Sequence, residues 1–116
     1  MYKETRPFSE RQNEASHMRA KYTDRLPIIV EPKDLKTTSI DKRKYMVQPD
    51  LTFGQLMYVI RKRMRVRPEQ ALFFFVGNGT LQPAGTTIGS TYDRFADDDG
   101  FLYVTYAFEN TFGSFC

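Results

Sequence analysis

The chain has 116 residues, of which 41% are hydrophobic and 27% are charged, and its formal net charge is +3 at pH 7. That length suits one compact domain with one core, and the composition is ordinary for a soluble globular protein. With a single histidine and a single cysteine, the chain can form no intrachain disulfide and is poorly equipped for a hydrolytic triad or a metal centre. The sequence predicts no catalytic residue, no metal site and no cofactor.

The absence of any long apolar run argues against membrane-spanning and secreted classes. No stretch approaches 18 apolar residues, and the segment from Met1 to Arg6 lacks the apolar core of a signal peptide. Together with the cysteine usage, this favours a cytoplasmic protein, so membrane attachment would need chemistry performed by other enzymes.

The first expected element is a helix that starts near Ser9. Ser9 and Gln12 have the spacing of a capping box, in which two side chains satisfy the backbone at a helix start. Ala15, Met18 and Tyr22 then recur on one side among charged residues. Because this apolar stripe is thin, we expect the helix to pack against the surface of the domain and not to form its core.

Two strands are expected next. Pro27 opens the β-branched run from Ile28 to Val30, and a second apolar run covers Tyr45 to Val47 before Pro49. Such short runs favour buried strands.

The strongest local signal is a helix that starts at Thr52. Thr52 and Gln55 form a second capping box, and Pro68 stops the pattern. Apolar residues recur at helical spacing between these limits, and they are Phe53, Leu56, Met57, Ile60 and Met64. The basic residues near the end of this segment complement the helix dipole.

The remaining elements are shorter. We expect a buried strand from Leu72 to Val76, a turn at 77–79, a short helix around Ile88 to Phe95, and a strand from Phe101 to Tyr106. The run from Asp97 to Gly100 lacks carboxylates at the first and last positions of a calcium loop, so it predicts an acidic turn. This order is compatible with an α+β fold of the β-grasp type.

Basic residues cluster in two short runs, which leaves two interpretations open. The runs are Lys42, Arg43 and Lys44, and Arg61, Lys62, Arg63, Arg65 and Arg67. They suit a solvated helix face or a contact with phosphates. Nucleic-acid binding is the weaker interpretation, because the three consecutive phenylalanines lie in an apolar strand and are not interleaved with arginine.

Several longer motifs, in the same order, closely resemble the autophagy ubiquitin-like modifiers. This is the lipid-conjugated family that includes the GABA-receptor-associated protein and the microtubule-associated light chain proteins. The resemblance runs from about Arg6 to Gly113 and is carried by Arg25 to Pro27, Ile40 to Tyr45, Tyr58 to Arg63, Asp99 to Tyr106 and Glu109 to Gly113.

The resemblance implies a ubiquitin-like β-grasp fold with two extra N-terminal helices. It divides the chain into a helical extension at 1–24, a core at 25–108 and a flexible tail at 109–116. It also implies that a cysteine protease cleaves after Gly113, removing Ser114 to Cys116. Activating and conjugating enzymes would then join the glycine to phosphatidylethanolamine, and the protein would recruit cargo receptors to the autophagosome or vesicle membrane.

The resemblance further implies that an aromatic-x-x-aliphatic peptide adds as a strand beside an edge strand at Lys44 to Val47. Two pockets would receive its two apolar side chains, and we expect both pockets on the same side of the sheet. The aromatic pocket would use Glu14, Met18, Pro27, Ile29, Lys44, Met46 and Phe101. The aliphatic pocket would use Tyr45, Val47, Pro49, Leu51, Leu56 and Val59. Acids flanking the motif would meet Arg25, Lys42 and Arg63, and Phe73 and Phe75 would dock the protease.

Some residues allow a plainer interpretation. Ile29, Leu56 and Val59 suit ordinary core packing as well as a pocket. A lone glycine such as Gly113 near a terminus often marks only flexibility, which leaves a non-conjugated β-grasp adaptor as the alternative function. The chain also departs from the family by inserting Gln48 before Pro49, and its turn at 77–79 is one residue longer than usual.

Overall fold

The computed structural model describes residues 1–34, 39–64 and 70–108 of the chain. Its helices and strands follow one another in this order: α1 (Tyr2–Thr5), α2 (Phe8–Lys21), β1 (Leu26–Pro32), β2 (Lys44–Val47), α3 (Phe53–Met64), β3 (Leu72–Val76), β4 (Thr80–Leu81), α4 (Ile88–Phe95) and β5 (Leu102–Phe108).

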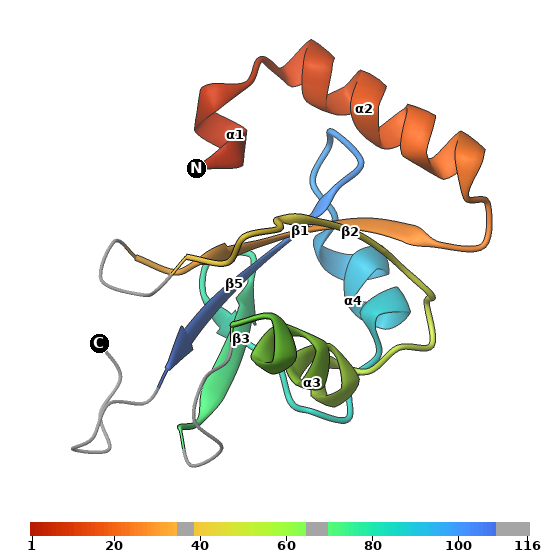
Figure 1. Ribbon diagram of the computed structural model, residues 1–116. Coiled ribbons are helices and arrows are strands. Elements are labelled where there is room, and N and C mark those ends of the chain that lie inside the picture. The colour runs from red at the N-terminus through yellow and green to blue at the C-terminus, as the bar shows by residue number, and fades with distance from the viewer. Residues whose placement is uncertain (35–38, 65–69, 109–116) are drawn as a thin grey trace.

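The strands form one mixed sheet in the order β2-β1-β5-β3-β4. The last strand, β5, lies in the middle, parallel to β1 and antiparallel to β3. Helices α1 and α2 lie on one side of the sheet and α3 on the other (Figure 1). The predicted α+β class is therefore confirmed, as are the β-grasp arrangement and the two extra N-terminal helices.

The two faces of the sheet are packed separately. On the α3 face, a continuous apolar cluster joins Phe53, Leu56 and Ile60 of α3 to Ile28 and Phe74 of the sheet. On the α1 and α2 face, a smaller cluster contains four fully buried residues, which are Tyr2, Ala15, Ile29 and Phe101. Side chains alternate between these faces along each strand.

One of the two predicted capping boxes is present. The Thr52 amide donates to Gln55 Oε1 at 2.9 Å, and the Gln55 amide donates to Thr52 Oγ1 at 3.2 Å. The box predicted at Ser9 is wrong, because α2 begins one residue earlier, at Phe8. Pro7 occupies the position before the helix with φ −60° and ψ 152°. Its ring fixes the entry of the chain, which leaves Ser9 inside the first turn.

The acidic turn predicted at Asp97 to Gly100 is confirmed and has a structural role. Gly100 has a φ of +96°, and its amide donates to the carbonyl of Asp97 at 2.9 Å. The buried Asp99 carboxylate accepts hydrogen bonds from the Phe101 amide at 2.8 Å and from Arg11 Nη1 at 2.6 Å. The turn thus anchors α2 to the start of β5.

A second polar contact holds α1. The Tyr2 amide donates to the buried carboxylate of Glu31 at 2.8 Å, and Lys3 pairs with Asp97. Burial raises the pKa of Glu31, although the hydrogen bond and charge of Arg43 offset part of that effect. Burial also raises the pKa of Asp97, but Lys3 and the Asp99 amide outweigh it, so the net pKa is lowered.

Candidate functional site

Strand β2 forms one edge of the sheet. It pairs antiparallel with β1, from Leu26 opposite Val47 to Ile29 opposite Lys44. In the described part of the chain no strand lies on its other side, as the resemblance implied. An edge strand presents a row of backbone donors and acceptors on which an extended peptide can add as a further strand.

Side chains of β2 alternate between the two faces of the sheet. Lys44 pairs with Glu14 of α2, which places it on the α2 face. The next residue, Tyr45, belongs to the apolar cluster on the α3 face, and Val47 packs against that cluster. The expectation that both pockets lie on the same side of the sheet is therefore wrong, because consecutive residues of β2 serve opposite faces.

The residues expected in the aromatic pocket come together between α2 and the sheet edge. Glu14 and Met18 are one helical turn apart on α2, and Met18 packs against the small cluster. Ile29 and Phe101, both 0% exposed, lie in that cluster and can form only a floor. Pro27 and Met46 are opposite one another in the β1–β2 ladder. These residues form a surface between α2 and the sheet edge that has a buried apolar base.

The residues expected in the aliphatic pocket lie between β2, the segment after it, and α3. Leu56 is 1% exposed and Tyr45 8%, so both are core residues. Val59, by contrast, is 40% exposed on the outer face of α3. Val47 and Leu51 are half-buried against the same cluster. The plainer interpretation therefore holds for Leu56 and Ile29 and fails for Val59.

Pro49 forms an exposed rim of this second set and is held in place by α4. The Gly89 amide donates to the Pro49 carbonyl at 2.8 Å. A Cβ added at Gly89 would lie only 2.9 Å from that carbonyl oxygen, so the close approach requires glycine. The extra residue Gln48 is accommodated in a tight turn, in which its carbonyl accepts from the Leu51 amide at 3.0 Å.

The three predicted cations are distributed along the edge. Arg25 is exposed immediately before β1, near the Val47 end of β2. Lys42 lies near the other end, with its Nζ 5.1 Å from the centroid of the Tyr45 ring. Arg63 forms two hydrogen bonds of 3.2 Å with the exposed carboxylate of Asp41. A peptide acid that engages Arg63 must therefore compete with Asp41.

Tyr2 is a residue near the site that sequence reasoning missed. Its ring packs edge-on against Phe101 with centroids 5.8 Å apart, and Lys44 Nζ lies 5.6 Å from its centroid. Helix α1 thus supplies part of the support for the pocket floor. Apart from Met1, the residues that flank Tyr2 are polar or charged and form no apolar pattern, so only the three-dimensional contact identifies its buried position.

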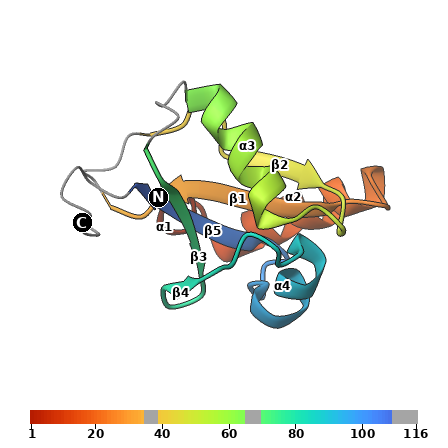
Figure 2. The ribbon, with the colours of Figure 1, turned by 90° about the horizontal axis from the view of Figure 1, so that it is seen from below.

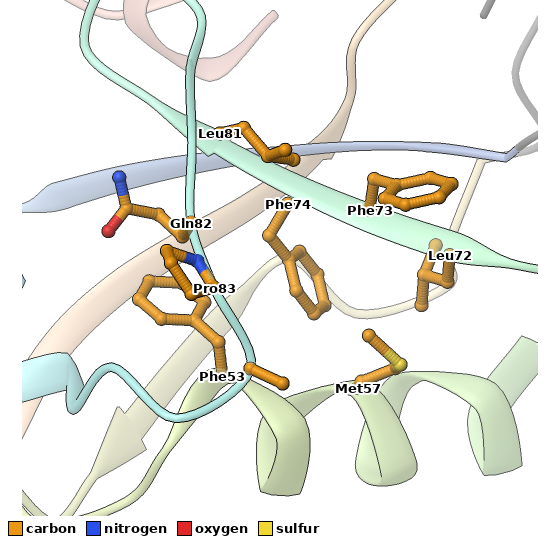
Figure 3. Close-up of a pocket in the computed structure, with 9 residues that line it drawn as sticks. Phe53, Met57, Leu72, Phe73, Phe74, Leu81, Gln82 and Pro83 are labelled. Carbon is orange, nitrogen blue, oxygen red and sulfur yellow. The ribbon is translucent and has the colours of Figure 1, made fainter.

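Strand β3, on the far side of the sheet from β2, carries the residues expected to dock a protease. Phe73 is opposite Ala107 and Phe75 is opposite Thr105, on the strand that leads to the tail. Phe73 also borders an apolar hollow of about 220 Å³ between β3, α3 and the segment from Leu81 to Ala84. Figure 3 shows Leu72 and Phe74 pointing toward α3, whereas Phe73 points away from it. Gly113 lies outside the described residues.

Comparison with known proteins gives the family. The family model "Autophagy protein Atg8 ubiquitin like" matches residues 10–113, nearly the whole chain. The chain belongs to the Atg8 family.

Relatives of known name and structure agree with this membership. The chain is 50% identical to Autophagy-related protein 8 of Neurospora crassa, covering 98% of this chain and 94% of that protein. It is 49% identical to Autophagy-related protein 8A of Oryza sativa subsp. indica, covering 97% and 95%. The crystal structure of Trypanosoma brucei ATG8 superimposes with a TM-score of 0.88 at 40% identity, covering 97% of each chain.

Proposed function

We propose that this Atg8-family chain is an autophagy modifier that is cleaved after Gly113 and conjugated to phosphatidylethanolamine. Once attached, it recruits cargo receptors and autophagy factors that carry an aromatic-x-x-aliphatic motif. It acts in the cytoplasm and, after conjugation, on autophagosome or vesicle membranes. None of the described helices is both long and apolar enough to cross a bilayer. The observation that supports the proposed peptide binding is that β2 is an edge strand with a group of apolar side chains beside it on each face of the sheet.

The spacing of the motif fits that edge. In an extended strand, side chains separated by three positions point to opposite faces. An aromatic-x-x-aliphatic peptide added beside β2 would therefore direct one anchor toward the Met18 and Phe101 side and the other toward the Leu51 and Val59 side. Backbone hydrogen bonds to β2 supply affinity, and the two apolar sets select the anchors.

The rim adds electrostatic selection. Arg25 lies near one end of β2 and Lys42 near the other, so acids on either side of the motif meet a positive charge. Both cations are exposed, so each pair contributes well under about 1 kcal/mol and is screened by salt. Their main effect is on the association rate of acidic peptides.

The tail supports the conjugation part of the proposal. The family match ends at Gly113, and glycine lacks the Cβ that would obstruct a narrow catalytic channel. A processing protease must also grip the folded domain near the cleavage point. Phe73 suits this role, because it lies beside Ala107 on the strand that feeds the tail. Phe75 is on the same face, although it is only 7% exposed.

The peptide site is tested with Leu51→Ala combined with Val59→Ala. Truncation of two interface anchors is expected to weaken binding of an aromatic-x-x-aliphatic peptide at least about tenfold. Leu81→Ala is the matched control, because Leu81 is 49% exposed at the opposite sheet edge. Calorimetric titration measures both, with circular dichroism as a check of folding. Equal affinity of the double variant and wild type would disprove the assignment of this pocket.

Conjugation is tested by reconstitution with the protease, the activating and conjugating enzymes, ATP and phosphatidylethanolamine vesicles. With the protease present, the full chain and a form ending at Gly113 are both expected to gain the mass of the lipid. Without the protease, only the form ending at Gly113 is expected to gain it. Gly113→Ala is expected to resist cleavage, whereas Ser114→Ala serves as a control that is cleaved. If the form ending at Gly113 gains no lipid while another Atg8 does, the chain is a non-conjugated adaptor.

A further inference from the structure

We infer that the end of the molecule at which β5 finishes is a docking surface for the anionic headgroups of a lipid bilayer. The inference rests on the proposed conjugation for its biological setting. It rests on charge and topology for its chemistry. We refer to this surface as the basic end, and its described cations are Lys33, Lys42, Arg43, Arg61, Lys62 and Arg63.

The topology brings these residues to one end of the sheet. Strand β5 finishes at Phe108, opposite Leu72 at the start of β3. The connection between β1 and β2 begins at the same end, where the Lys33 amide donates to the Tyr106 carbonyl at 2.8 Å. In Figure 2 the last turn of α3 reaches the side of the molecule where β3 starts.

Two contacts fix α3 at that end. Arg63 bonds to Asp41 in the β1–β2 connection at 3.2 Å, and Arg61 bonds to the Gln70 carbonyl just before β3. Lys62 lies between these two arginines and is exposed. Three segments that are separate in sequence thus converge on the basic end.

The two ends of β5 differ in their exposed charge. The described acids near the basic end are Glu4, Glu31, Asp34 and Asp41, against six cations. Glu31 pairs with Arg43 and Asp41 pairs with Arg63, so these charges offset each other. The outward positive charge therefore comes mainly from the exposed side chains of Lys33, Lys42 and Lys62. At the start of β5, Asp97 pairs with Lys3 and Asp99 pairs with Arg11, so the acid exposed there is Asp98. A negatively charged surface would therefore orient the molecule with its basic end inward.

The proposed lipid attachment points the same way. Gly113 follows Phe108 by five residues, so covalent geometry keeps it within roughly 18 Å of that strand end. The longest dimension of the molecule is 43 Å. Attachment at Gly113 therefore holds the basic end near the bilayer, whereas the Asp98 end can lie several Debye lengths of about 8 Å away.

A membrane fits this surface better than a nucleic acid does. Several aromatic rings lie within reach of these cations. Tyr2, Tyr45 and Phe75 are buried, whereas Tyr58 is 64% exposed, with Lys62 Nζ 5.3 Å from its centroid. A tyrosine beside lysine suits the headgroup region, where a ring is half in water and half in apolar surroundings. Single-stranded nucleic acid is usually held by several successive stacking rings, and such a row is not present among the described residues of the basic end.

The test uses the full, unconjugated chain and vesicles of phosphatidylcholine with or without phosphatidylserine. Lys33→Glu combined with Lys62→Glu removes two cations that are outside the peptide site. Binding to vesicles with phosphatidylserine at low salt is expected to fall on the order of tenfold or more. The matched control is Lys21→Glu combined with Arg94→Glu, which makes the same charge change away from the basic end and is expected to retain binding within about twofold.

Three outcomes contradict the inference. They are binding that ignores phosphatidylserine, equal losses in both variant pairs, and binding of single-stranded RNA through Lys33 and Lys62 that displaces the vesicles. None of these measurements uses the conjugating enzymes, so failure of lipid conjugation and failure of this inference are distinguishable.

Orientation gives a second readout. The sole cysteine, Cys116, can be coupled to a maleimide lipid, which tethers the full chain without enzymes. With a paramagnetic lipid in the bilayer, amide signals of Lys33 and Lys62 are expected to broaden more when phosphatidylserine is present. The Asp98 amide is expected to remain sharp. Broadening of all three that does not depend on phosphatidylserine would overturn the assignment of this surface.

Discussion

The two faces of the sheet are covered by helices in very different ways. On the α3 face, a helix with a wide apolar stripe seals a continuous cluster of aliphatic and aromatic side chains. On the other face, α1 and α2 bury few apolar residues and depend on ion pairs of Lys3 with Asp97 and of Arg11 with Asp99. The first arrangement is insensitive to pH and salt, whereas the second depends on ionised partners. The edge strand β2 lies where these two halves meet.

The largest expected effect comes from the α3 face. Phe53 is 0% exposed and packs on Phe74 with ring centroids 5.8 Å apart. Phe53→Ala removes that packing and leaves a cavity, so the free energy of unfolding should fall by about 3 to 5 kcal/mol. Urea denaturation measures the loss, and all elements should unfold together. A loss confined to α3, with the sheet intact, would contradict the idea of a single core on this face.

The next effect concerns the ionic half. Arg11→Met leaves the buried Asp99 carboxylate without its cation, which should cost about 3 kcal/mol. We expect the cost to appear mainly as faster hydrogen exchange in α2, because the core beneath α3 is unaffected. Arg19→Met is the control, since Arg19 is exposed on the same helix. Uniformly faster exchange across α2 and α3 would show that the two faces unfold as one unit.

A smaller effect, of opposite sign, is expected at Tyr45. Its hydroxyl is buried and has no hydrogen-bond partner among the described residues. Tyr45→Phe removes an unsatisfied polar group while it keeps the ring, so the protein should gain about 1 kcal/mol of stability. Thermal denaturation of this variant beside wild type measures the change. A loss of stability would mean that a bound water satisfies the hydroxyl.

The smallest effect is a pH dependence. The pKa of Asp97 is lowered from an ordinary value of 3.8 in the folded chain. The stabilisation it provides is therefore present above that value and is lost as the pH falls through the folded pKa. The stability difference between wild type and Asp97→Asn should shrink as the solution is acidified below about 3.8.

Glu31 makes the opposite contribution. Its pKa is raised above 4.5 by burial, so it reduces stability as the pH rises from that value through the folded pKa. Glu31→Gln should therefore remove this fall in stability between pH 4.5 and the folded pKa of Glu31. For Asp97, a stability difference between wild type and Asp97→Asn that grows on acidification would mean that the folded pKa of Asp97 is raised and not lowered.

The contrast between the faces also explains what the sequence could predict. The helical period of Phe53, Leu56 and Ile60 is a local signal, and it identified α3 together with its cap at Thr52. The ionic half depends on pairs such as Arg11 and Asp99, which are 88 residues apart and leave no local pattern. The cap expected at Ser9 was wrong because Pro7 fixed the start of α2. Strand β4 has only two residues, too few for any periodicity.

The candidate site was predicted in part by resemblance and in part not at all. The position of β2 at the edge followed from the resemblance, and the sheet order confirms it. The two pockets were expected on the same side of the sheet because the residues that the resemblance implied do not by themselves show to which face each side chain points. Once the register of β1 and β2 is known, alternation alone divides the list between two faces. The roles of the individual residues stay predictions.

The central place of β5 has a mechanical consequence for a protein tethered through its tail. A pull on the C-terminus acts along β5, which has five paired positions with β1 on one side and five with β3 on the other. Backbone hydrogen bonds lie across the strand direction, so the load is shared among them in shear and is not applied to one pair after another. If the chain is conjugated as proposed, its last strand can therefore resist tension from a moving or bending membrane without disturbing the outer edge at β2.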